Sequence, residues 1–126
     1  MWDIYHLYCR LGKAIQVVEK IVEPRAPQLT SQERERRKAL FQGHTLYHFR
    51  ISPFAWRVRR KIAQYGLEIP MRDILEDPHA QEELVSKGGK DQVPCLKIEG
   101  TGSPAKWMYE SADINDYFKR RLTSQP

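Results

Sequence analysis

The sequence has no long apolar run and few cysteines. No stretch of its 126 residues approaches the ~20 consecutive apolar residues that a membrane-spanning helix needs. Two cysteines, Cys9 and Cys95, are too few for a disulfide framework or a cysteine zinc site. The first residues, MWDIYHLYCR, lack the apolar block and cleavage site of a secretory signal. We therefore expect a cytoplasmic protein with no bound metal.

Motifs for nucleic-acid binding are also absent. The formal net charge of +5 is mildly basic, but no helix-turn-helix, zinc finger or aromatic-basic RNA motif is present. The basic run Arg57, Arg59, Arg60 and Lys61 spreads around a helix, which favours a solvated face over a phosphate site. We expect no nucleic-acid partner.

The composition is that of a small folded domain with an N-terminal addition. Hydrophobic residues make up 40% of the chain and charged residues 29%, enough for a core and a polar surface. Residues 3–23 predict an amphipathic helix that packs on the domain, on its copy in a homodimer or on a membrane surface. Because of the last alternative, the protein could also be located at the periphery of a membrane. The apolar stripe consists of Ile4, Leu7, Tyr8, Leu11, Ile15, Val18, Ile21 and Val22.

A charged connector follows the amphipathic segment. Pro24 and Pro27 end the first helix, and Thr30 with Glu33 forms a capping box that predicts a second helix. That helix ends before Gly43. We therefore divide the chain into an N-terminal helical extension with connector, residues 1–43, and a domain of residues 44–126.

The domain alternates strands and helices. Helix starts are marked by Ser52-Pro53, by Asp77-Pro78 and by Ser111, which we expect to cap the last helix. The order is β-α-β-α-β-β-α, an α/β fold with a four-stranded mixed sheet. The first two strands should be parallel, and the last two should form an antiparallel hairpin. The expected strands are residues 45–50, 67–72, 93–99 and 106–109.

Three stretches of this domain resemble a known family. TLYHFRISPFAWRVRR resembles the first strand, active loop and first helix of glutaredoxins and of glutathione transferase N-terminal domains. DQVPCLKIEG resembles their cis-proline loop and third strand, and MYESADINDYF resembles their Glu-Ser entry into the last helix. The resemblance covers residues 45 to about 122. It implies a thioredoxin-like fold.

The resemblance also implies a site for glutathione or another thiol peptide. In the family, the residue before the cis-proline offers its backbone N–H and C=O to the ligand, and the Glu-Ser step holds the γ-glutamyl end. A helix N-terminus is a natural carboxylate site. The implied glutathione-binding residues are Arg50, Ser52, Phe54, Gln92, Val93, Pro94, Glu110 and Ser111.

The active loop lacks the cysteines of a glutaredoxin. Ser52 and Ala55 stand at the two cysteine positions, and a serine hydroxyl is far too basic to replace a thiolate. The sequence therefore favours a glutathione-binding module with little or no disulfide reductase activity. One alternative is that Ser52 activates glutathione as in a glutathione transferase. Another is a glutaredoxin-type oxidoreductase whose loop cysteines were replaced by engineering.

Cys95 directly follows Pro94 and so lies close to the implied site. On a central strand we expect its thiol to point into the core as a small apolar group. If the thiol faced the loop instead, it would be a single redox cysteine.

Overall fold

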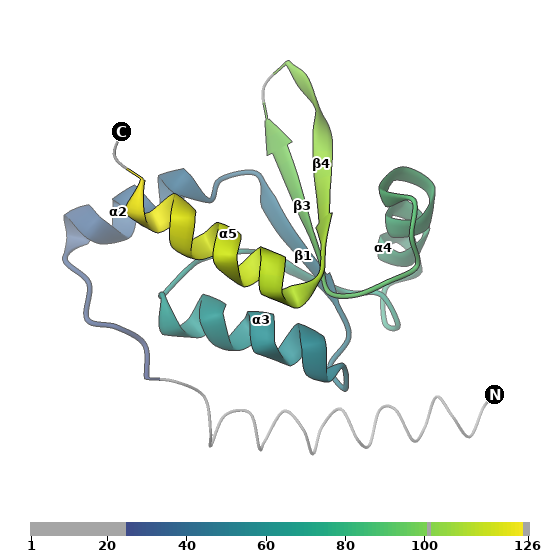
Figure 1. Cartoon of the computed structure of the whole chain (residues 1–126), viewed down its shortest axis with the longest axis horizontal. Helices are drawn as coiled ribbons and strands as arrows, with labels where there is room; N and C mark the ends of the chain where they lie inside the picture. Colours follow the sequence, from purple (N-terminus) through teal and green to yellow (C-terminus); the bar gives the residue numbers. More distant parts are fainter. Residues whose placement is uncertain (1–24, 101, 125–126) are drawn as a thin grey trace.

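The chain folds as strands and helices around one mixed sheet. The structure, a computed structural model, describes residues 25–100 and 102–124; the amphipathic segment 3–23 lies outside them. Within these ranges, no helix combines the length and apolarity needed to cross a bilayer. The elements are α2 (Ser31–Leu40), β1 (His44–His48), α3 (Pro53–Gln64), β2 (Met71–Asp73), α4 (Pro78–Glu83), the π-helical turn η1 (Leu84–Gly88), β3 (Cys95–Gly100), β4 (Ser103–Tyr109) and α5 (Ser111–Thr123) (Figure 1).

The sheet has the strand order β2-β1-β3-β4. β1 pairs with β2 in parallel, while β3 pairs with β1 and β4 in antiparallel fashion. The α/β class and the order β-α-β-α-β-β-α predicted from the sequence are confirmed. So are the parallel pairing of the first two strands and the antiparallel hairpin of the last two.

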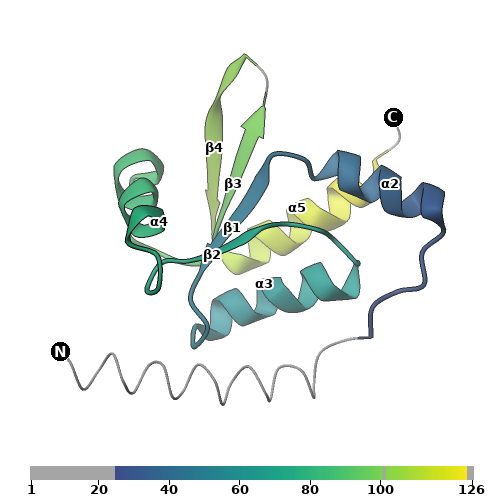
Figure 2. The same cartoon turned by 180° about the vertical axis from the view of Figure 1, so that it is seen from behind.

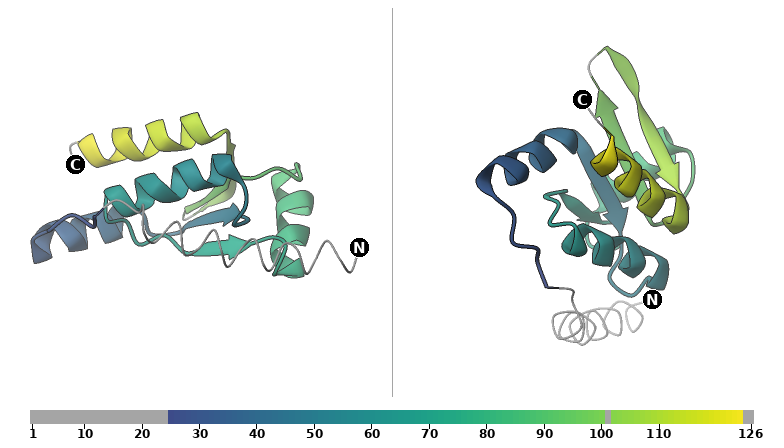
Figure 3. Two further views of the ribbon diagram at one scale, coloured as in Figure 1. Left: turned by 90° about the horizontal axis from the view of Figure 1, so that it is seen from below. Right: turned by 60° about the vertical axis from the view of Figure 1, so that its left-hand side comes forward.

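The two central strands are buried on both faces. Neighbouring residues of a strand point to opposite sides, so Leu46 and Tyr47 enter different clusters, as do Cys95 and Leu96. All four side chains are at most 1% exposed. Helices α3 and α5 lie side by side on one face, and α4 with η1 covers the other (Figure 3).

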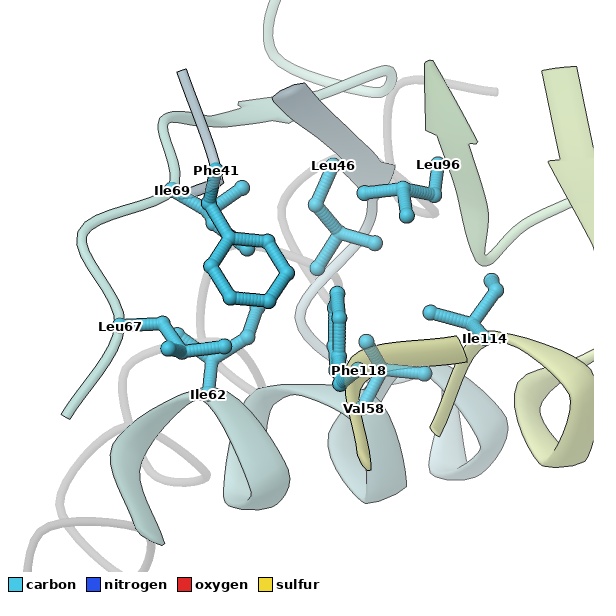
Figure 4. Packing of buried hydrophobic residues seen from close by; sticks show 9 residues of the cluster. All are labelled: Phe41, Leu46, Val58, Ile62, Leu67, Ile69, Leu96, Ile114 and Phe118. Atoms are coloured by element: carbon cyan, nitrogen blue, oxygen red, sulfur yellow. The ribbon is translucent and has the colours of Figure 1, made fainter. Parts of the chain in front are cut away.

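The larger cluster lies between the sheet and helices α3 and α5. The rings of Phe41 and Phe118 meet edge to face, with centroids 5.7 Å apart. Phe41 comes from the end of the connector, so α2 contributes to the core of the domain. Figure 4 shows this cluster, which consists of Phe41, Leu46, Val58, Ile62, Leu67, Ile69, Leu96, Ile114 and Phe118.

Arginines fasten α2 to the ends of the neighbouring helices. Arg36 donates to the Leu122 carbonyl at 2.7 Å, and Arg37 donates to the carbonyl of Tyr65. In return, Arg121 donates to the carbonyl of Leu40 at 2.6 Å. Each bond satisfies a carbonyl at a helix C-terminus, where no helical N–H is available.

Several strand bounds differ from the sequence-based expectation. The second strand is residues 71–73 rather than 67–72, because Leu67 and Ile69 fill the core before Pro70 and only residues 71–73 lie in register with β1. The last strand begins at Ser103, because the hairpin turn is tighter than predicted and Ser103 already pairs with Gly100. The third strand begins at Cys95, after the Val93–Pro94 step.

Two glycines give a matched test of backbone packing. Gly43 and Gly102 have φ of +80° and +77°, so alanine at either position costs about 1–2 kcal/mol. At Gly43 a Cβ would also lie 2.7 Å from the Glu99 carbonyl oxygen, whereas at Gly102 nothing lies within 4 Å. We expect Gly43→Ala to lower the free energy of unfolding by about 1–3 kcal/mol more than Gly102→Ala in urea denaturation. Equal losses would contradict the close approach at Gly43.

Candidate functional site

The sheet register brings three connecting segments to one end of the sheet. Cys95 pairs with Tyr47 on β1 and with Tyr109 on β4. β1 and β4 run toward this end, and β3 runs away from it. The segment after β1, the segment before β3 and the segment after β4 therefore leave the sheet together. Figure 2 shows the three strands converging there, close to the first turns of α3 and α5.

Ser52 ends the segment after β1 and caps α3. Its Oγ accepts a hydrogen bond from the Ala55 N–H at 3.2 Å, and Pro53 takes the first helical position. Its own N–H donates to the Phe49 carbonyl at 3.1 Å, which closes a turn. The Ser52 side chain is buried, with 5% of the residue exposed. The structure thus fixes the hydroxyl by both bonds.

Phe54 follows Pro53 in the first turn of α3 and is exposed. More than half of the residue, 55%, is exposed, which is unusual for a phenylalanine. The Arg57 guanidinium lies 5.7 Å from its ring centroid. The loop therefore offers an apolar and cationic surface next to Ser52.

The sequence predicts that Arg59 belongs to a solvated basic face, but its side chain reaches back to the loop. Its guanidinium donates to the Arg50 carbonyl at 3.0 Å and to the Phe49 carbonyl at 3.4 Å. A third contact, 3.0 Å long, joins Nη1 to His48 Nδ1. A guanidinium can only donate, so Nδ1 of His48 is unprotonated and accepts.

The surroundings of His48 disfavour its charged form. The pKa of His48 is lowered from 6.5 to about 4, mainly by burial and then by the charges of Arg59 and Arg50, while Asp73 opposes the shift. Arg50 itself is half-buried, and its Nε lies 3.9 Å from a Glu76 carboxylate oxygen. Arg50, one of the residues expected to bind glutathione, therefore already faces an acid.

The segment before β3 contains Gln92, Val93 and Pro94. The peptide bond between Val93 and Pro94 is cis. Val93 is half-buried, and Gln92 Nε2 donates to a Glu110 carboxylate oxygen at 3.4 Å. Two of the expected binding residues, from different segments, thus lie side by side.

The start of α5 differs from the sequence-based expectation. Ser111 was expected to cap this helix, but Glu110 is the N-cap residue and makes no side-chain capping bond. Glu110 has φ of +71° and ψ of 115°, a sparsely populated region that costs a non-glycine residue about 1–3 kcal/mol. This turn carries Ser111 into the first helical position, where it is 9% exposed and cannot cap.

Cys95 points into the core, as expected. It is fully buried between Tyr47, Ile74 and Leu84, and burial raises the pKa of its thiol to about 12. Its hydrogen-bond partner Tyr109 has a phenol pKa raised to about 12, also mainly by burial. Such a thiol carries almost no thiolate at neutral pH, so the structure disfavours a redox role for Cys95.

The comparison with known families identifies the domain. The model of the glutathione S-transferase N-terminal domain matches residues 46–125. The chain belongs to this family. The family match confirms the resemblance drawn from the three sequence motifs.

Solved structures give further similarity. A maleylacetoacetate isomerase from Anaeromyxobacter dehalogenans is 32% identical over 63% of this chain and 35% of its own, with a TM-score of 0.47. A second structure of that isomerase, with bound dicarboxyethyl glutathione and citrate in the active site, is 31% identical over 63% of this chain and 36% of its own, with a TM-score of 0.48. Glutathione transferase Omega 3C from Trametes versicolor shares the fold, with 21% identity over 80% of this chain and 43% of its own and a TM-score of 0.54.

The chain spans well under half of the length of these proteins, 35% to 43%. Comparison with curated protein sequences gave no match. Among residues 25–100 and 102–124, no group of three or more histidine, cysteine, aspartate or glutamate side chains is arranged to hold a metal ion.

The depressed pKa of His48 predicts a pH dependence of stability. The neutral form is favoured in the folded state, so the unfolded chain binds more protons between pH 6.5 and 4. As the pH falls through this window, we expect protonation of His48 to lower the free energy of unfolding by up to about 3 kcal/mol. Urea denaturation from pH 7 to pH 4 measures it. His48→Gln keeps an acceptor for Arg59 and should flatten the profile, whereas His79→Gln, at an exposed position, should leave the slope unchanged.

The buried thiol of Cys95 predicts resistance to alkylation. In a Cys9→Ser background, iodoacetamide should modify Cys95 in the folded protein about a thousandfold more slowly than in urea, because the raised pKa suppresses the thiolate. Mass spectrometry over time gives both rates. Rapid labelling of the folded protein would mean that the thiol faces the loop.

Proposed function

We propose that this domain binds glutathione at the end of the sheet where its three connecting segments meet, and that it does so without disulfide exchange. The observation that carries the proposal is the register of Cys95 with Tyr47 and Tyr109. It gathers a helix cap, a half-buried backbone edge and an exposed carboxylate into one place. In a member of the glutathione S-transferase N-terminal family, those are suitable partners for a γ-glutamyl tripeptide.

The γ-glutamyl end is assigned to the start of α5. The first N–H groups of a helix attract a carboxylate, and the Glu110 side chain does not cap those of α5. The Glu110 carboxylate, exposed and 3.4 Å from Gln92, suits the ligand's ammonium group. Ser111 provides a further hydrogen-bonding group at the same turn.

The remainder of the tripeptide is assigned to Val93 and the loop. Val93 offers its N–H and C=O to the cysteinyl backbone, with Pro94 fixing the direction of the chain. Gln92 and Arg50 suit the glycyl carboxylate, and Phe54 lies next to Ser52, where the ligand thiol would point.

The proposal that the site does not exchange disulfides follows from the groups that the structure describes there. Ser52 and Ala55 occupy the positions that carry cysteines in a glutaredoxin, and Cys95 is buried with a pKa raised to about 12. Neither Ser52 nor Cys95 supplies a thiolate at neutral pH. A binding module is the function that these groups support best.

A second candidate is transferase-like activation of the ligand. A hydroxyl that accepts one bond, as Ser52 does from Ala55, can still donate its proton to a thiolate. Such a donor lowers the pKa of the glutathione thiol and makes the ligand the nucleophile. The exposed Phe54 ring is a surface on which an electrophile could rest.

Glutathione binding is tested by amide NMR titration. We expect reduced glutathione at millimolar concentration to shift the amides of Ser52, Val93 and Ser111 together. Glu110→Gln should weaken binding about tenfold, because it removes a charge-assisted contact. The control Glu68→Gln removes the same charge at an exposed position outside the three segments. Absence of shifts in the wild-type protein would refute the proposal.

The two candidates differ in turnover. If Ser52 activates the ligand, the protein conjugates glutathione to 1-chloro-2,4-dinitrobenzene, and Ser52→Ala lowers kcat while leaving the dissociation constant of glutathione within about twofold. If the domain is only a binding module, the conjugation rate with either the wild-type protein or Ser52→Ala equals the rate with glutathione alone. Photometric assays with and without the protein separate the two results.

A further inference from the structure

We infer that Arg59 is the positioning residue of this site: its guanidinium holds the backbone turn that places the Ser52 hydroxyl. The inference rests on the proposed glutathione site for its functional meaning. Its structural part concerns the free protein alone. Arg59 lies in the second turn of α3, so one helix both begins at Ser52 and returns a side chain to the loop that precedes it.

The contacts of Arg59 define the role. Nη2 donates to the Arg50 carbonyl at 3.0 Å, and Nη1 lies 3.4 Å from the Phe49 carbonyl and 3.0 Å from His48 Nδ1. The Phe49 carbonyl also accepts the N–H of Ser52 at 3.1 Å. Arg59 therefore binds consecutive residues of the turn, and one of the carbonyls that it binds also fixes Ser52.

The neighbours of Arg59 do not share this arrangement. The Arg57 guanidinium lies 5.7 Å from the ring centroid of Phe54, and that of Arg60 lies 4.8 Å from the ring centroid of Trp56. Both lie on aromatic rings of their own helix. Arg60 is thus a matched control, because it has the same charge and is also half-buried on the same helix.

Chemistry explains why an arginine suits the position. A planar guanidinium presents several N–H donors in a fixed fork, so it can bind two carbonyls and an imidazole at once. Bonds from a charged donor to backbone carbonyls are stronger than neutral ones. A lysine keeps the charge but cannot reproduce the fork. The turn should therefore loosen stepwise from arginine to lysine to glutamine.

The test measures local opening by amide hydrogen exchange in the ligand-free protein. We expect Arg59→Gln to raise exchange about tenfold at the amides of Ser52 and Trp56, through loss of a charge-assisted bond. The Trp56 amide donates to the Ser52 carbonyl at 3.0 Å and so reports the same turn. The Leu46 amide, bonded to the Pro70 carbonyl at 2.9 Å, reports the core and should keep its rate.

A second measurement connects the turn to the ligand. Arg59→Gln should weaken glutathione binding about tenfold, Arg59→Lys less, and Arg60→Gln not at all. If Arg59→Gln fails to fold, Arg59→Lys carries both measurements.

The inference is overturned if exchange at Ser52 is unchanged in the Arg59 variants, or if exchange at Leu46 rises equally, since Arg59 would then serve the whole fold. It is also overturned if Arg60→Gln has the same local effect. If the wild-type protein does not bind glutathione, the proposed function fails, while hydrogen exchange still decides the role of Arg59.

Discussion

The pairing of Cys95 with Tyr47 on one side and Tyr109 on the other is the constraint on which the rest of the structure depends. Side chains alternate along a strand, so a slip of one residue would turn Cys95 toward α3 and α5 and Leu96 toward α4. Both are fully buried, and each fits the cluster that it enters. The same register decides where the chain leaves the sheet. Packing of the core and assembly of the candidate site are therefore one requirement.

The two helices that begin at this end of the sheet differ in whether a side chain caps their first N–H groups. At α3, the Ser52 hydroxyl accepts from Ala55, so the protein satisfies one of these groups itself. At α5, Glu110 provides no side-chain cap, and its carboxylate lies beside Gln92 instead. An anion is therefore better accommodated at α5 than at α3. This difference supports the assignment of the ligand's α-carboxylate to the start of α5.

Sequence patterns predicted those parts of the fold that are determined locally. Ser52-Pro53 predicts a helix start without knowledge of distant residues, because the cap and the fixed φ of proline act within one turn. The strand expected at 67–72 was misplaced, because Leu67 and Ile69 alternate like a strand while only residues 71–73 lie in register with β1. The role of Arg59 was missed for a related reason. Two of its three partners are turn carbonyls, which no residue type in the sequence reveals.

The loop Ser52-Pro53-Phe54-Ala55 and the step at Glu110 bear differently on function. Ser52 caps a helix, Pro53 opens it, and Ala55 is fully buried, so folding alone accounts for these three residues. Folding does not account for Glu110 in this way. Its backbone conformation, with φ of +71°, costs about 1–3 kcal/mol, its carboxylate is exposed, and its side chain caps no helix. A residue that folding does not explain is the better evidence for a ligand. The case for a binding site therefore rests more on the Glu110 step than on the loop where a glutaredoxin would hold its thiols.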